Sequence, residues 1–173
     1  MRGKVLKKLS PLPAFLMFCA ATALAVAAFA ATPAPSLSIQ RLAFVEEIMG
    51  LAQYKPHPGG SSFTQDEECE VYVEVAGFST PLVEGSQGEY AFHLALDAVI
   101  KASGGEILAS QSGIDEQEDT AYMELTQHYL AFSFNLRDWP EGDYVLEVGV
   151  RDLLSGQLVS RDLPLRLEPG ETK

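Results

Sequence analysis

Alternation between apolar and polar side chains is the feature that most restricts how this chain can fold. In residues 69–75 the odd positions are apolar, and in residues 90–100 the even positions are apolar. The same period of two recurs in residues 130–136 and 144–150. Successive side chains of a β-strand point to opposite faces, so this period predicts strands that each have one buried face.

Turns rich in Gly and Ser separate further strands. The Gly-Gly pair within residues 103–106 is typical of a tight hairpin, and it leads into a strand near 106–111. A short strand is predicted at 122–127, and the turn at 153–156 leads into a last strand at 157–167. Six or seven short strands with this spacing predict a mainly β fold, an antiparallel two-sheet β-sandwich in residues 68–168.

Residues 38–53 follow a different pattern. Glu46 and Glu47 lie off a stripe of apolar residues that recurs every three to four positions, the period of an amphipathic helix. The stripe consists of Leu42, Val45, Ile48, Met49 and Ala52. We therefore expect one short helix at 38–53, followed by a loop at 54–67 that is rich in Pro, Gly and Ser.

The N-terminal residues 1–30 have the pattern of a secretory signal peptide. Four basic residues and no acid precede an uncharged run at 11–31, which contains an Ala-Phe-Ala end at 28–30. The alternative is an uncleaved membrane anchor, because a run of this length can span a bilayer. We expect a periplasmic or secreted protein, with a linker at 31–37 and a disordered tail at 169–173.

The net charge of the exported chain limits the kinds of partner that it can bind. Removal of residues 1–30 takes away four of the 12 Lys and Arg and none of the 24 Asp and Glu, which leaves a formal charge of −16. Such a surface repels nucleic acid and anionic lipid and favours cationic partners. Cys69 is then the only cysteine, so no intramolecular disulfide can form. Its position on the apolar face of a predicted strand indicates a structural core residue.

The stretch Gly142-Asp143-Tyr144-Val145-Leu146 resembles the Gly-x-Tyr-x-Leu signature of immunoglobulin-like, fibronectin type III-like and macroglobulin-type sandwiches. In such sandwiches the tyrosine at the start of the strand bonds back to nearby backbone, as a tyrosine corner. The resemblance implies an immunoglobulin-like sandwich in which Tyr144 and Gly142 have structural roles.

A wider resemblance, to uncharacterised exported bacterial domains, covers most of the chain after residue 30. It is carried by Tyr54-Lys55-Pro56, by Phe63, by the strand Tyr72 to Phe78 and by the hairpin Gly142 to Gly156. The chain departs from that pattern at Gln65-Asp66, where a Pro-Gly pair would stand. This resemblance implies the fold and the compartment but carries no activity.

Catalytic motifs are missing from the sequence. It has no Ser-His-Asp motif, no nucleophile elbow and no Gly-rich phosphate loop. The histidines His57, His93 and His128 lack the spacing of zinc ligands. We expect that the protein is not an enzyme and that it binds no cofactor. A hydrolase remains a remote alternative that requires His93, His128 and an acid to meet in a cleft.

Two groups of side chains are candidates for ligand binding. The acidic segment at 114–120 is predicted to be a loop, and its carboxylates are hard oxygen ligands of the kind that Ca²⁺ prefers. Those carboxylates belong to Asp115, Glu116, Glu118 and Asp119. The aromatic residues Tyr72 and Tyr129 lie on the strand faces opposite the apolar ones, and Trp139 lies in a loop. These residues could bind a sugar or a peptide, or pack beneath the expected helix.

Together these features favour a non-enzymatic exported module for protein interaction or cell-envelope assembly. Its expected partner is an envelope or secreted protein, without nucleic acid and without stable membrane insertion after signal cleavage. The alternative is a carbohydrate- or calcium-binding module.

Overall fold

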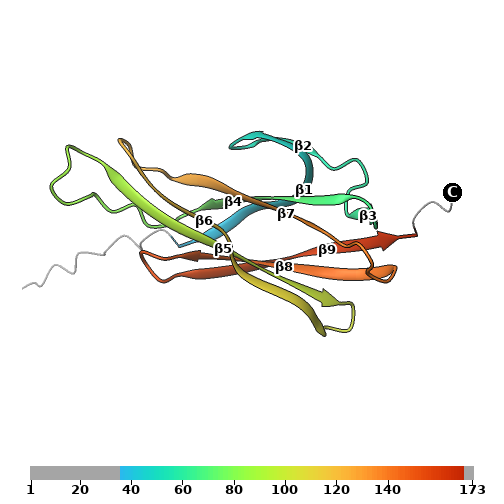
Figure 1. Cartoon of the computed structure of the whole chain (residues 1–173). Helices are drawn as coiled ribbons and strands as arrows, with labels where there is room; N and C mark the ends of the chain where they lie inside the picture. The colour runs from blue at the N-terminus through green and yellow to red at the C-terminus, as the bar shows by residue number, and fades with distance from the viewer. Residues whose placement is uncertain (1–35, 170–173) are drawn as a thin grey trace, which may run out of the picture. The chain divides into compact units, whose positions relative to one another are not determined.

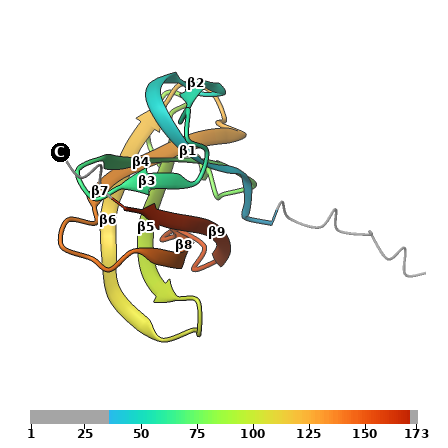
Figure 2. The same ribbon diagram turned by 90° about the vertical axis from the view of Figure 1, so that its right-hand side faces the viewer.

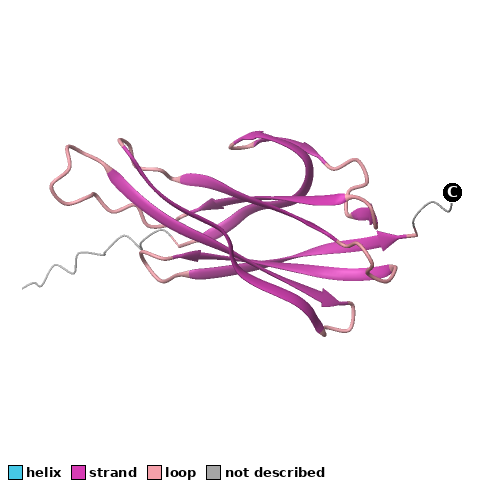
Figure 3. Cartoon of the chain, in the orientation of Figure 1, coloured by secondary structure: helices cyan, strands magenta, loops and turns pink. Residues whose placement is uncertain are grey.

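Every regular element that the computed structural model describes, within residues 36–169, is a β-strand (Figure 3). The nine strands are β1 (Ser38–Gly50), β2 (Gln53–Pro56), β3 (Ser62–Thr64), β4 (Glu68–Ala76), β5 (Tyr90–Ala102), β6 (Ile107–Ala121), β7 (Gln127–Asn135), β8 (Gly142–Asp152) and β9 (Leu158–Glu168). The predicted mainly β fold is confirmed, with more strands than expected. In this range no helix is long and apolar enough to cross a membrane. The predicted signal peptide, most of the linker and the tail residues 170–173 lie outside the described residues.

The strands form two sheets (Figure 1). One sheet has the order β2-β1-β4-β7, and the other has the order β3-β9-β8-β5-β6. Neighbouring strands are antiparallel except β3 and β9, which are parallel. The turns that follow β4, β6 and β8 gather at the left of Figure 1, and those that follow β5 and β7 gather at the right.

The core lies between the two sheets. Two strands bury every second residue there: β4 from Cys69 to Val75, and β8 from Tyr144 to Val150. Leu130 and Phe132 of β7 and Leu94 and Leu96 of β5 complete much of the contact. The strands that the alternation predicted at 69–75, 90–100, 130–136 and 144–150 are therefore confirmed, together with their buried faces.

The helix predicted at 38–53 is wrong, because these residues form β1, a turn and the start of β2. Ile39 and Leu42 both lie opposite inner-face residues of β4, with a bulge in the register between Ile39 and Arg41. The extra residue of the bulge turns a spacing of two into a spacing of three. Further irregularities follow where β1 pairs with β2. The period that suggested a helix thus comes from bulges in a strand.

The end of β1 and β2 curl over the outer face of the sheet, above β4 (Figures 1 and 2). The ring of Tyr54 lies 4.8 Å from that of Tyr72, centroid to centroid. The backbone N–H of Ala52 donates to the Tyr72 hydroxyl oxygen at 2.8 Å, and Tyr72 is 0% exposed. This hairpin takes the packing position expected for the helix. The loop predicted at 54–67 is also corrected, because it contains most of β2 and all of β3.

The tyrosine corner expected at Tyr144 is present. Its hydroxyl donates to the Pro140 carbonyl oxygen at 2.5 Å, and its ring lies edge to face on Trp139 at 5.6 Å. Gly142, between them, has a φ of 151°, which side chains disfavour. These contacts fix the turn that leads from β7 into β8.

Replacement of Tyr144 by Phe tests that corner. We expect a loss of about 0.5 to 1.5 kcal/mol in the free energy of unfolding, because one hydrogen bond is removed while the ring stays. Urea denaturation measures this loss. Tyr122→Phe, at a ring that is 80% exposed, is the control, and an equal effect in the two variants would contradict the assignment.

Candidate functional site

A cleft of about 310 Å³ opens between the two sheets beside β6 and β7. Buried Ala98, Phe132 and Leu146 form its floor, and half-buried side chains stand around its rim. The apolar rim residues include Ile114, Phe134 and Trp139. We call this hollow the inter-sheet cleft. Its floor reaches down to residues of the apolar core.

The cleft exists because β6 and β7 are tied together over only part of their length. Each is the last strand of its sheet. The Asp115 carboxylate accepts the Ala131 N–H at 3.2 Å, and Gln117 Oε1 lies 2.7 Å from His128 Nε2. In the described part of the chain no hydrogen bond joins residues 107–114 to β7. The first half of β6 therefore forms one wall of the cleft and β7 the other.

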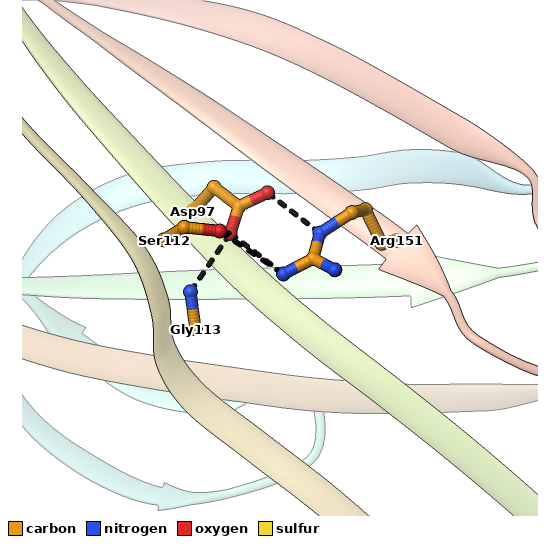
Figure 4. A network of polar contacts seen from close by, with 4 residues as sticks. All are labelled: Asp97, Ser112, Gly113 and Arg151. Carbon is orange, nitrogen blue, oxygen red and sulfur yellow. Dashed lines mark hydrogen bonds and ion pairs between the residues drawn. The ribbon is translucent and has the colours of Figure 1, made fainter.

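A bulge in β6 separates its two halves. Leu96 pairs with Asp115, whereas Ala98 pairs with Gln111, so three residues of β6 face Asp97 alone. Asp97 Oδ1 accepts the Ser112 hydroxyl at 2.5 Å and the Gly113 N–H at 2.8 Å (Figure 4). A bulge bends its strand. Asp97 thus holds the bend at which β6 leaves β7.

Arg151 of β8 completes this network (Figure 4). Its Nε donates to Asp97 Oδ2 at 2.8 Å, and its Nη2 donates to Oδ1 at 3.0 Å. The bond to Arg151 lowers the pKa of Asp97 to about 2, against the opposing effect of burial and with help from Ser112 and Gly113. The carboxylate therefore stays charged until strongly acidic pH.

Replacement of Asp97 by Asn is expected to change the acid dependence of stability. A carboxyl with a depressed folded pKa stabilises the protein above its unfolded pKa near 4, and this stabilisation disappears as pH falls towards 2. We expect the wild type to lose about 2 kcal/mol more than the variant between these pH values. Urea denaturation at a series of pH values measures the difference. Asp143→Asn, at an exposed carboxylate, should follow the wild type, and parallel curves for all three proteins would contradict the role of Asp97.

The three aromatic residues predicted to bind ligand do not come together. Tyr72 is buried beneath the β1–β2 hairpin, and half-buried Tyr129 stacks on it with ring centroids 5.6 Å apart. Both lie on the outer face of their sheet. Trp139 lines the inter-sheet cleft and also a second hollow of about 480 Å³. Of the three, Trp139 alone remains in the candidate site.

The predicted acidic loop is wrong, because its residues belong to β6 and pair with β5. Asp115 and Asp119 lie opposite inner-face residues of β5, while Glu116 and Glu118 lie opposite residues of the outer face. Adjacent carboxylates therefore point to opposite faces. Within residues 36–169 no group of three or more His, Cys, Asp or Glu is arranged to hold a metal ion. The short strand predicted at 122–127 is likewise wrong, since most of it is the loop before β7.

The histidines are dispersed as well. His93 Nε2 lies 2.8 Å from Glu116 Oε1 on the outer face, whereas His128 is bonded to Gln117 on the inner face. Burial lowers the pKa of His128, and Asp115 and Asp119 act against that shift. His57 stacks on Phe63 with ring centroids 4.1 Å apart. The structure therefore does not bring His93 and His128 together in one cleft.

Cys69 lies in the core, 1% exposed, on the inner face of β4. Burial raises the pKa of its thiol to about 12, with additional contributions from Glu67 and Glu68. The thiolate is the nucleophilic form, so this side chain is chemically inert at neutral pH.

Asp152 was not singled out by its sequence context, yet its carboxylate is 1% exposed. It accepts the Ser79 N–H at 2.7 Å, the Leu154 N–H at 3.0 Å and the Ser155 hydroxyl at 2.6 Å. These bonds join the loop after β4 to the turn after β8. Asp97 and Arg151 were missed for the same reason, because a charged residue on a strand gives no sign of its partner on another strand.

No family model and no curated protein matches the chain. Solved structures with a similar arrangement include an alkylpurine DNA glycosylase from Pseudomonas fluorescens, at 14% identity and a TM-score of 0.45 over 78% of this chain and 31% of that one. They also include a β-glucosidase from Listeria innocua, at 7% identity and a TM-score of 0.41 over 80% and 17%. A CARDB domain from Pyrococcus furiosus, in complex with di-metal ions, has 13% identity and a TM-score of 0.33 over 77% and 92%. The chain thus spans less than a third of the first two proteins, and these likenesses carry no argument about its function.

Proposed function

We propose that this protein is a non-enzymatic, exported module that binds another envelope or secreted protein through the inter-sheet cleft. The observation that carries the proposal is the opening between β6 and β7, where Phe134, Ile114 and Trp139 stand half-buried around a floor of core residues. Clefts with an apolar floor and aromatic rim residues are typical binding sites.

The proposal includes an immunoglobulin-like β-sandwich fold. Two mainly antiparallel sheets around one core and the Tyr144 bond to Pro140 support it. Export is supported by the signal-peptide pattern of residues 1–30, whose removal leaves a charge of −16 on the remaining chain. A surface of this charge favours a cationic partner.

Carbohydrate binding is the second candidate function, and the position of Trp139 favours it. Trp139 lines both the inter-sheet cleft and the neighbouring hollow that Leu108 and Pro140 also line. A sugar ring can stack on such an indole face. Tyr72 offers no second stacking surface, because the β1–β2 hairpin covers it.

Site-specific photocrosslinking tests the proposal in the native cell. The full-length gene is expressed with benzoylphenylalanine in place of Trp139, or in place of Ser160, an exposed residue of β9 across the sheet from β6. We expect a discrete protein adduct at position 139 and none at 160. No adduct at 139, or the same adducts at both positions, would contradict the proposal. A thermal shift of the purified protein with glycans, without an adduct, would favour the carbohydrate alternative.

A further inference from the structure

We infer that the edge of β7 at Ser133 is the docking position for an extended partner segment whose side chains are alternately apolar and basic. The inference rests on the proposed function, because it specifies how the inter-sheet cleft takes a protein. It follows from the direction of the β7 backbone groups, from the two hollows beside Ser133 and from the charge of one of them.

The β7 backbone has unpaired groups at this edge. The Ala131 N–H bonds to the Asp115 carboxylate, so it points away from β4 and towards β6. The register of β4 and β7 runs without interruption, with Tyr72 opposite Ala131 and Glu70 opposite Ser133. Backbone direction repeats every second residue in an antiparallel strand, so the Ser133 N–H points the same way as that of Ala131. No carboxylate or strand of the described chain takes it, and an open edge of this kind pairs with an added strand.

Two hollows of different character meet at Ser133. On the inner side is the inter-sheet cleft, to which the neighbouring residues Phe132 and Phe134 contribute apolar surface. On the outer side is a hollow of about 470 Å³ that we call the acidic hollow. Its polar lining consists of Glu46, Glu67, Glu68, Glu70, His57 and Ser133, and the apolar residues Val45 and Pro58 complete it. Side chains of an added strand alternate between the two sides, so one set enters the cleft and the other faces the acidic hollow.

The acidic hollow carries excess negative charge. Glu46 pairs with Lys55 at 2.7 Å, while Glu67 and Glu68 accept bonds from uncharged groups, the Thr64 N–H and the Ser133 hydroxyl. Four glutamates therefore face one lysine. Carboxylates that line a concave surface attract Lys and Arg, and this sets the basic positions of the partner segment.

A second copy of this chain fits the site poorly. Its longest edge strand is β6, whose second half carries Asp115, Glu116, Glu118 and Asp119. Pairing of that edge with β7 would bring Glu116 and Glu118, on the outer face, towards the acidic hollow. Like charges across an interface oppose association. A basic segment of another protein is the occupant that the charges favour.

Binding of a labelled peptide of alternating lysine and valine tests the inference on the purified exported chain. We expect saturable binding by fluorescence anisotropy, weakened by salt, and little binding of a peptide with the same residues grouped in two blocks. Ser133→Pro should weaken binding by about tenfold or more, because it removes the outward N–H and leaves a peptide carbonyl unpaired. Ser133→Ala is the matched control, since it loses the same hydroxyl and keeps the N–H. Ala109→Trp, which fills the cleft from the β6 side, should abolish binding.

Thermal unfolding of each variant shows that the fold is retained. Binding that is equal in Ser133→Pro and Ser133→Ala would overturn the inference, and so would no binding of the alternating peptide at about 1 mM. A crosslink at position 139 together with either of these results would leave the proposed function standing and remove only this mode of docking. Absence of both the crosslink and the peptide binding would remove both.

Discussion

Replacement of Asp152 by Ala is expected to lower the free energy of unfolding by about 3 to 5 kcal/mol. The carboxylate is 1% exposed and accepts bonds from Ser79, Leu154 and Ser155. Its removal takes away a charged acceptor from three part-buried hydrogen bonds, and bonds to charged groups contribute more than those between neutral groups. The pKa of Asp152 is lowered even though burial acts to raise it, because the bonds from Ser155 and Ser79 favour the charged form.

Urea denaturation at neutral pH measures this effect. Asp152→Asn keeps one acceptor oxygen and should lose less than the Ala variant. Asp66→Ala, at an exposed carboxylate, should change stability by less than about 0.5 kcal/mol. If Asp152→Ala and Asp66→Ala changed the free energy of unfolding equally, the Asp152 carboxylate would not be what holds the two loops together.

Replacement of Phe63 by Ala is expected to have a comparable effect, about 3 to 5 kcal/mol. The side chain is 1% exposed, and its ring meets that of Phe44 edge to face at 4.8 Å. It anchors β3, which adds only three parallel residues beside β9, and it supports the stacked ring of His57. Loss of the ring leaves a cavity and detaches this short edge strand.

The Phe63 result is measured by the same denaturation experiment. Tyr122→Ala removes a ring of similar size that is 80% exposed, and it should cost less than about 0.5 kcal/mol. A small effect at Phe63 would mean that residues 54–67 are the peripheral loop that their composition suggests. A large effect would show that they belong to the core.

The strands with one continuous buried face could be predicted from the sequence because their signal is local. Residues 69–75 and 144–150 alternate without interruption, and the structure buries the predicted side of each. In residues 38–50 bulges interrupt the alternation, and the resulting spacing imitates a helix. The loop predicted at the acidic residues of β6 was wrong for another reason. The inward-facing carboxylates lie at a sheet edge, where Asp115 contacts β7. Inward charges at edges discourage unwanted pairing, but in a sequence they are typical of a loop.

Less of the candidate site than of the fold could be predicted from the sequence. Trp139 stood out as the single tryptophan in a loop, and it does line the cleft. Ser133 did not stand out, since its importance depends on the strand beside it, on the missing strand on its other side and on glutamates from other parts of the chain. Such non-local combinations leave no pattern within a short stretch of residues.

Amide hydrogen exchange at two residues of β7 tests the central claim most directly. In the free protein the Ala131 amide, bonded to Asp115, should exchange slowly, and the Ser133 amide should exchange fast. On addition of the alternating lysine-valine peptide, the Ser133 amide should slow by more than about tenfold while that of Ala131 stays as it was. An unchanged Ser133 amide in the presence of bound peptide would contradict strand addition at β7.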